Sequence, residues 1–233
     1  MFELPEERYT GHHWVPFKKF SLDKTQLPMC VTTLSIFNEE RASEVLFKEV
    51  RKTRLESADL CSITLDPNTA HRNVSLKPNC EGNECATFKS QPLDYPDHPD
   101  RFTDCVQVLS KEPLTGRCYF EVCPTGACFI GLTYNSIARR GKGKQGVLGL
   151  NDKSWACFGG GYVPQGTDNG TWLLIPNPCT NRVGVYLDYG RGVLTFYSVF
   201  TEVLAVLHKS KFTKPLYFGA VFMTPGDHVV IPK

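Results

Sequence analysis

The sequence predicts an all-β fold, a sandwich of two antiparallel sheets, from residue 58 to the C-terminus. Short runs rich in Val, Ile, Leu, Phe and Tyr alternate there with clusters of Gly, Pro, Asn and Asp, at a spacing of about ten residues. No long amphipathic helix interrupts these runs, which disfavours the helical crossovers of a parallel sheet. The 233 residues are enough for such a sandwich to bury a sizeable core.

Residues 1–57 have a different composition and form an N-terminal extension. Asn38 is suited to cap a helix that runs to about Arg54, and apolar residues recur along one face of this segment (residues 38–54). The apolar stripe consists of Ala42, Val45, Leu46 and Val50. A single helix cannot bury such a stripe by itself. We therefore expect the extension to dock on the rest of the chain or on sequence outside it, and residues 58–233 to fold without it.

A first hairpin is predicted between residues 117–123 and 128–134, which flank the turn-forming residues 124–127. This pairing places Cys123 opposite Cys128. Facing Cβ atoms in an antiparallel pair lie about 4.5–5.5 Å apart, slightly long for a disulfide, so we expect two thiols that bridge only on oxidation.

A second hairpin is predicted between residues 182–189 and 193–199, turned by residues 190–192. Asp188, at the end of the first of these strands, is placed to tie down the turn through hydrogen bonds. Two further strands, residues 216–222 and 229–231, follow. Large aromatic side chains supply buried area to the sandwich, namely Phe120, Trp155, Phe196, Tyr197 and Phe222.

Composition and charge exclude several classes of protein. The 26 basic and 24 acidic residues leave a net charge of +2, which gives no case for nucleic acid. No apolar run approaches the ~20 residues that span a bilayer. The N-terminus is acidic and contains a proline, unlike a signal peptide, so we expect a cytoplasmic protein whose ten cysteines are reduced thiols. No cysteines stand in C-x-x-C spacing, so we expect no metal and no cofactor.

Five motifs, in order, resemble those of the PRY-SPRY family. Residues 63–71 resemble the L-D-P-x-T-A-H opening of the PRY segment, and residues 95–102 followed by Val108-Leu109 resemble the P-x-R-F…V-L stretch that ends it. Residues 114–122 are similar to the G-R-x-Y-W-E-V motif that starts the SPRY part. Residues 153–155 and residues 183–197 complete the set.

The resemblance implies a bent β-sandwich made of PRY (residues 58–110) and SPRY (residues 114–233). It further implies a non-catalytic protein-recognition module, of the kind found at the C-terminus of tripartite-motif ubiquitin ligases, innate-immune NACHT receptors and stonustoxin-like proteins. The family usually continues W-E-V-E-W, whereas this chain has Phe120-Glu121-Val122-Cys123-Pro124 and so lacks both tryptophans and the second glutamate. Contacts made by those missing side chains do not carry over.

Catalytic motifs are absent from the sequence. Residues 139–146 look superficially phosphate-binding, but the Gly-Lys-[Ser/Thr] sequence of a P-loop and its following helix are lacking. Neither G-x-S-x-G nor H-E-x-x-H occurs. We therefore expect no enzyme activity, and ubiquitin-ligase activity would need a RING module that this chain lacks.

Function is expected in two loops. Between Val122 and Asn151 no acidic residue occurs, while Arg139, Arg140, Lys142 and Lys144 are basic. This stretch is either a solvated turn or a contact for an acidic protein partner. The second loop, residues 159–172, combines glycines with Tyr162 and Trp172, which are either interface anchors or, for Trp172, the start of a buried strand.

Two other functions remain open beside protein binding. Lectin-like sandwiches share this architecture, and Asp168-Asn169 is the one calcium-type pair available for a carbohydrate site. The resemblance to stonustoxin-like chains also allows a C-terminal module of a pore-forming protein. The sequence names no partner.

Overall fold

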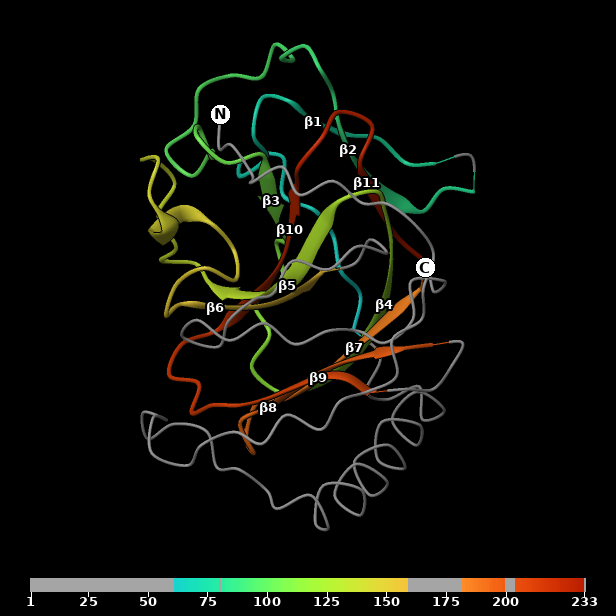
Figure 1. Cartoon of the computed structure of the whole chain (residues 1–233), viewed down its shortest axis with the longest axis vertical. Helices are drawn as coiled ribbons and strands as arrows, with labels where there is room; N and C mark the ends of the chain where they lie inside the picture. Colours follow the sequence, from blue (N-terminus) through green and yellow to red (C-terminus); the bar gives the residue numbers. More distant parts are fainter. Residues whose placement is uncertain (1–60, 80, 159–181, 200–203, 233) are drawn as a thin grey trace, which may run out of the picture. The chain divides into compact units, whose positions relative to one another are not determined.

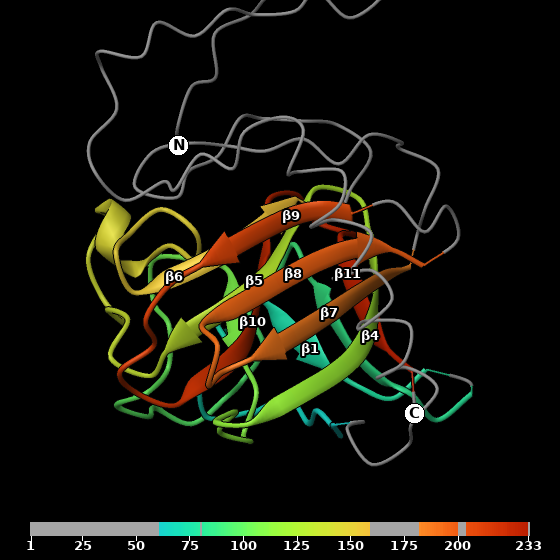
Figure 2. The same cartoon turned by 90° about the horizontal axis from the view of Figure 1, so that it is seen from below.

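Two antiparallel sheets packed face to face make up the part of the chain that the structure, a computed structural model, describes: residues 61–79, 81–158, 182–199 and 204–232 (Figures 1 and 2). Within these residues the larger sheet has seven strands, in the order β1 (Val74–Leu76), β2 (Glu84–Phe88), β11 (His228–Ile231), β4 (Arg117–Thr125), β7 (Val183–Asp188), β8 (Val193–Ser198) and β9 (Leu204–Lys209). The smaller sheet has four, in the order β3 (Gln107–Leu109), β10 (Leu216–Phe222), β5 (Cys128–Tyr134) and β6 (Ser154–Phe158). All strand pairs are antiparallel, which confirms the predicted fold class.

Apolar side chains from the facing sides of the two sheets fill the space between them. Phe120 of β4 and Phe218 of β10 meet edge to face with ring centroids 5.4 Å apart, and so connect the sheets directly. Trp155 packs in the same way against Tyr134 at 5.3 Å and Phe212 at 5.0 Å. Of the aromatic residues predicted to be buried, the following four are confirmed: Phe120, Trp155, Phe196 and Phe222. The side chain of Tyr197 lies outside the described part.

The predicted hairpin around residues 124–127 is wrong, although both of its strands form. β4 pairs with β7 and β11 in the larger sheet, whereas β5 pairs with β6 and β10 in the smaller one. The link between them crosses from sheet to sheet at Gly126, whose φ is 80°. A Cβ at this position would lie 2.2 Å from Oδ1 of Asp227, which accepts a hydrogen bond from the amide of Ala127 at 3.0 Å. Glycine at position 126 therefore allows the close approach that redirects the chain.

The second predicted hairpin is confirmed. β7 and β8 pair along their length, from Val183 opposite Ser198 to Asp188 opposite Val193. As expected, Asp188 ties down the turn, because its Oδ1 accepts a hydrogen bond from the amide of Arg191 at 3.0 Å. Its Oδ2 lies 3.7 Å from Nε of Arg191 and 3.9 Å from Nε of Arg117.

A buried arginine joins the turn that precedes β1 to the segment between β1 and β3. Arg101 is only 4% exposed, and its guanidinium donates to three backbone carbonyls. Nη1 donates to the carbonyls of Pro67 at 2.9 Å and Ala70 at 2.5 Å, and Nε and Nη2 both donate to that of Pro96, at 3.1 and 2.9 Å. The guanidinium also lies over the ring of Tyr95, 5.0 Å from its centroid. Arg101 thus joins the turn at residues 67–70 to the segment that contains Pro96.

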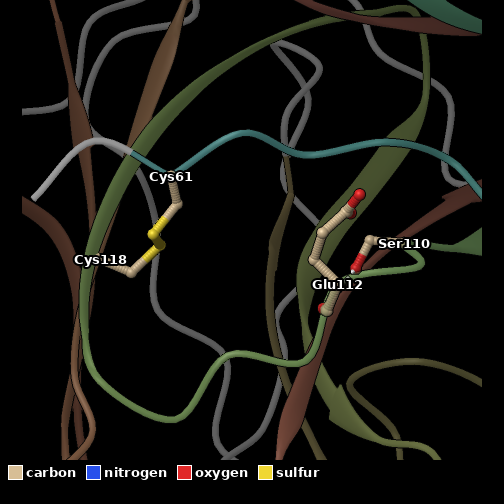
Figure 3. The surroundings of a disulfide bond; sticks show 4 residues. All are labelled: Cys61, Ser110, Glu112 and Cys118. Atoms are coloured by element: carbon tan, nitrogen blue, oxygen red, sulfur yellow. Dashed lines mark hydrogen bonds between the residues drawn. A yellow bond between two sulfur atoms is a disulfide. The ribbon is translucent and has the colours of Figure 1, made fainter.

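One pair of cysteines departs from the expected thiol state. Cys61 is joined to Cys118 of β4 by a disulfide, with Cα atoms 5.6 Å apart. The amide of Cys61 also donates to the carbonyl of Tyr119 at 2.9 Å, so the chain is fixed to β4 at this point by two contacts. Figure 3 shows the bond, with Ser110 and Glu112 on the segment that leads into β4. The sequence spacing of 57 residues gave no indication of this pairing.

Five other cysteines of the described residues are free thiols: Cys85, Cys105, Cys123, Cys128 and Cys157. Cys123 and Cys128 do not face each other, because Cys123 lies opposite Val230 and Cys128 opposite Phe222. The optional bridge expected between them is therefore excluded by the sheet topology. Burial raises the pKa of the Cys128 thiol to about 12, so it stays protonated and unreactive at neutral pH.

Three expectations fall outside the described residues: the helix over residues 38–54 and the placements of Tyr162 and Trp172.

Removing the disulfide is expected to lower the free energy of unfolding by about 2–4 kcal/mol, because the bond closes a loop of 57 residues in the unfolded chain. Urea unfolding of the double variant Cys61→Ala/Cys118→Ala, compared with the oxidised wild-type protein, measures this loss. Adding reductant should destabilise the wild type and leave the variant unchanged. An equal response of both proteins to reductant would contradict the prediction.

Candidate functional site

The predicted basic loop, defined here as residues 138–146, lies between β5 and β6. Its two ends are joined by a hydrogen bond from the amide of Ala138 to the carbonyl of Gln145, at 3.3 Å. A single 3-10 turn, Lys144–Gly146, closes it. The loop is therefore a closed structure with its own backbone hydrogen bonds, rather than an extended connection.

The segment that follows Arg101 holds the basic loop in place. The amide of Thr103 donates to the carbonyl of Arg139 at 3.1 Å, and Oδ2 of Asp104 accepts from the amide of Gly141 at 2.9 Å. Gln107 is 1% exposed; its amide nitrogen donates to the carbonyl of Gly146 and its Oε1 accepts from the amide of Leu148 at 3.4 Å. Residues of the predicted PRY segment thus fix a loop that follows β5.

Asn151 fastens the loop from its other side. Its Nδ2 donates to the carbonyl of Val147 at 2.7 Å and to those of Lys144 and Gln145 at 3.2 and 3.3 Å. Its Oδ1 accepts from the hydroxyl of Ser154 at 2.9 Å, and that side chain is buried. Side-chain amides therefore hold the loop from both ends.

The four basic residues of the loop are not equivalent. Arg139 is half-buried, with its guanidinium 4.7 Å from the centroid of the Phe102 ring. It donates to the carbonyl of Ile137 at 2.8 Å and to the side chain of Asn135. Burial lowers the pKa of Arg139, and the nearby carboxylates partly offset this effect by raising it. The group remains a cation. Arg139 is therefore an anchor of the loop. The three exposed residues are Arg140, Lys142 and Lys144.

Acidic residues from elsewhere in the chain lie beside this positive charge. The hydroxyl of Thr103, the amide of Gly141 and the charge of Lys142 lower the pKa of Asp104, which keeps this carboxylate ionised next to the loop. The charges of Asp100 and Asp66 act to raise the pKa of Arg139, which places these two carboxylates near the loop as well. Although no acid occurs between Val122 and Asn151 in the sequence, the net positive charge around the folded loop is therefore smaller than the sequence suggests. The surface carries both signs.

His71 contacts the segment that holds the basic loop, through the carbonyl of Thr103. Its Nδ1 accepts from the amide of Asn73 at 3.0 Å, and its Nε2 lies 3.2 Å from the carbonyl of Thr103. These contacts together assign the neutral tautomer with the proton on Nε2. Burial is the largest cause that lowers the pKa of His71 below its ordinary value of 6.5.

The residues that hold the loop were not predicted from the sequence, namely His71, Asp104, Gln107 and Asn151. Spacing offers no signal for them, because their partners are 37 to 41 residues away for Asp104 and Gln107. Within the described ranges no three His, Cys, Asp or Glu side chains are grouped so that they could hold a metal ion. In the same ranges no helix is long and apolar enough to cross a membrane.

Two family models match the chain, the SPRY-associated domain (PRY) at residues 63–114 and the SPRY domain at residues 117–232. Neoverrucotoxin subunit alpha of Synanceia verrucosa is 35% identical over 162 residues, which cover 67% of this chain and 23% of that subunit. Tripartite motif-containing protein 16 of Mus musculus is 35% identical over 176 residues, which cover 73% of this chain and 31% of that protein. The chain spans less than a third of the length of either relative.

Two solved structures are similar to the fold described above. The stonustoxin structure superposes with a TM-score of 0.64 at 30% sequence identity, over 74% of this chain and 27% of that chain. The PSpry domain of TRIM65 superposes with a TM-score of 0.66 at 21% identity, over 81% of this chain and 96% of that chain. At 21% identity, the similarity to the TRIM65 domain shows a common fold and nothing more.

Replacing Arg139 by Ser is expected to lower the free energy of unfolding by about 1–2 kcal/mol, because it removes a cation–π contact and two hydrogen bonds. Arg140→Ser is the matched control, since an exposed neighbour with the same charge should cost no more than about 0.5 kcal/mol. Denaturant unfolding of both variants measures the difference. Equal stabilities would show that Arg139 does not anchor the loop.

Stability is expected to fall as the pH drops below about 6.5, the ordinary pKa of histidine. Because the pKa of folded His71 is lowered, the unfolded state binds more protons between the folded pKa and 6.5, and protonation therefore favours unfolding. The stabilisation is fully present above this window. Unfolding free energies at pH 7 and pH 5 should differ more for the wild type than for His71→Gln. The same pH dependence in both proteins would contradict this assignment.

Proposed function

The chain belongs to the PRY-SPRY family, and from this premise we propose that it serves as a non-catalytic module that binds a protein ligand through its surface loops. The sandwich proposed for this role spans residues 58–233, with PRY at about 58–110 and SPRY at about 114–233. One observation carries the proposal: the basic loop is held rigidly from both sides while Arg140, Lys142 and Lys144 remain exposed. Because a rigid loop is already ordered, it loses little conformational entropy when its charges bind a partner.

The polar groups around the loop favour binding over catalysis. Asp104, Gln107 and Asn151 each hold loop backbone, and both ring nitrogens of His71 have backbone partners. A general acid or base needs a polar atom that faces the substrate. Here those atoms are committed to holding the loop.

The proposed ligand is a protein with an acidic surface. Arg140, Lys142 and Lys144 attract it from a distance of about a Debye length, roughly 8 Å at physiological salt. Asp100 and Asp104 on the neighbouring segment repel a misplaced acidic group and so restrict the orientation of the partner. Tyr162 and Trp172 remain proposed apolar anchors, and they lie outside the described residues.

The cellular context belongs to the same proposal. We propose an innate-immune or ubiquitin-ligase context in the cytoplasm, as the resemblance to tripartite-motif proteins implies. We further propose that the ligand is not nucleic acid, since the net charge is only +2. Any ligase activity would belong to other chains or other domains.

A second candidate function rests on the similarity to the fish toxin subunits. Neoverrucotoxin subunit alpha matches over 67% of this chain, which is compatible with a module at the C-terminus of a pore-forming protein. Release of a dye from lipid vesicles by the purified chain would support this candidate. Intact vesicles, together with retained ligand binding, would favour the recognition module.

Replacing Arg140, Lys142 and Lys144 together by Ser should slow association with the ligand by about tenfold or more at low salt, and should flatten its salt dependence. Dissociation should change by less than about twofold, because exposed rim charges act mainly on encounter. Surface plasmon resonance against the protein captured by the wild type measures both rates. The control variant replaces three exposed lysines elsewhere, Lys77, Lys89 and Lys111, and should bind as the wild type does. Equal slowing by both variants would mean that net charge, not the loop, steers binding.

From a cytoplasmic location we expect the Cys61–Cys118 pair to be mostly reduced in the cell, since glutathione and thioredoxin keep cytosolic cysteines as thiols. Rapid alkylation in denaturant, followed by mass measurement of protein from its native source, tests this. Labelling of both cysteines supports the cytoplasmic proposal. Protection of both would instead place the protein in an oxidising compartment.

A further inference from the structure

The Cys61–Cys118 bond joins two sulfur atoms that lie in unlike surroundings. Cys118 of β4 is 1% exposed and belongs to the core cluster between the sheets. Cys61, on the segment that crosses β4 in Figure 3, packs against that cluster but is partly exposed. A thiolate opens a disulfide by attacking one of its two sulfur atoms, and access decides which one. A small thiol can therefore attack Sγ of Cys61, whereas Sγ of Cys118 is shielded.

Contacts that use no sulfur atom hold the two cysteines beside each other. The amide of Cys61 donates to the carbonyl of Tyr119 at 2.9 Å. Two residues further on, Ile63 is 4% exposed in the core, and the amide of Thr64 donates to Oε2 of Glu112 at 2.8 Å. All of these contacts are available to the reduced chain. They keep the two Cα atoms, 5.6 Å apart in the oxidised protein, at a separation from which the bond can form again.

We propose that Cys61 and Cys118 form a reversible redox pair, in which Cys61 exchanges with glutathione or another small thiol and Cys118 is the buried thiol that resolves the product. The partly exposed sulfur is the one that a small thiol reaches, and the shielded sulfur is held next to it in both redox states. This inference does not depend on the proposed function of the basic loop.

The pair opens by two exchange steps. The thiolate of a first glutathione attacks Sγ of Cys61, a bond forms between these two sulfur atoms, and Cys118 leaves as a thiolate that takes up a proton from water. The thiolate of a second glutathione then attacks the sulfur of the bound glutathione. This step releases glutathione disulfide and the thiolate of Cys61, which is also protonated. Two electrons thus pass to the protein, and closure is the reverse reaction, with glutathione disulfide as the oxidant.

The other cysteines of the described residues lack this arrangement, and all five are free thiols. Two of them are buried. Burial raises the pKa of Cys105 to about 12 and also raises the pKa of Cys123, so little thiolate forms at either position at neutral pH. Cys85 is partly exposed but lies opposite Val230 of β11. Cys85 is therefore a thiol that small disulfides can reach and that has no cysteine opposite it on β11 to resolve the product.

The redox pair encloses the whole PRY match. The bond joins residues 61 and 118, and the family model matches residues 63–114 between them. Oxidation therefore closes this segment into a covalent loop on β4 and restricts the conformations that it can reach when it opens locally. Thr103, Asp104 and Gln107, which hold the basic loop, lie within the enclosed stretch. The redox state thus changes how firmly the PRY segment is closed onto the SPRY part.

Incubation of the full chain with glutathione and glutathione disulfide at neutral pH, followed by an acid quench and peptide mass mapping, tests the proposal. In Cys118→Ala, glutathione should accumulate on Cys61, because the resolving thiol is missing. In the wild type the same adduct should be at least about tenfold less abundant, since Cys118 converts it to the internal bond. In Cys61→Ala, Cys118 should carry no glutathione, because its sulfur is shielded. Cys85 is the internal control and should be modified equally in all three proteins.

Two results would overturn the proposal. Equal amounts of the Cys61 adduct in the wild type and in Cys118→Ala, including none in either, would show that Cys118 does not resolve it. Glutathione on Cys118 in Cys61→Ala would show that the buried sulfur is open to exchange. If a variant fails to fold, the reduced wild type decides: iodoacetamide under native conditions should label Cys61 at least about tenfold faster than Cys118, and equal rates would contradict the assigned roles.

Discussion

The buried guanidinium of Arg101 is the interaction on which the proposed recognition surface depends. A charge removed from water is costly unless its donors are satisfied, and Arg101 satisfies its donors with the carbonyls of Pro67, Ala70 and Pro96. These carbonyls belong to two separate segments, the turn at residues 67–70 and the segment that contains Pro96, and neither can move without leaving the charge unpaired. The residues directly after Arg101 then reach the basic loop: Phe102 lies under Arg139, and Thr103 and Asp104 hold the loop backbone. The position of the loop is therefore set from the PRY segment.

This arrangement divides the polar residues into two groups. Those with partners inside the protein, such as Gln107 and Asn151, give the loop its shape, and a loop of fixed shape loses little entropy on binding. Those without such partners in the described contacts, Arg140 and Lys144, are left to act on a ligand. Arg139 illustrates the division, because it is basic in sequence and yet serves the loop rather than the ligand.

The sequence predicts the fold well wherever neighbouring residues decide the outcome. The β7–β8 hairpin and its Asp188 follow from turn residues and strand spacing, and both were correct. The predicted pairing of β4 with β5 failed because the crossing at Gly126 depends on Asp227, a hundred residues away. The Cys61–Cys118 bond and the acids beside the basic loop were missed for the same reason. Such long-range contacts are products of the topology, and one sequence carries no local trace of them.

The most direct test of the central claim is to map the bound ligand on the protein by NMR, with the ¹⁵N-labelled chain titrated by the protein that it captures. The account predicts that amide shifts concentrate in the basic loop and in the segment from Asp97 to Asp104 that holds it. It also predicts that the shifts weaken as salt is raised, because exposed charges are screened. Shifts confined to the opposite end of the sandwich, around the turns at residues 77–83 and 223–228, with the basic loop unperturbed, would contradict it.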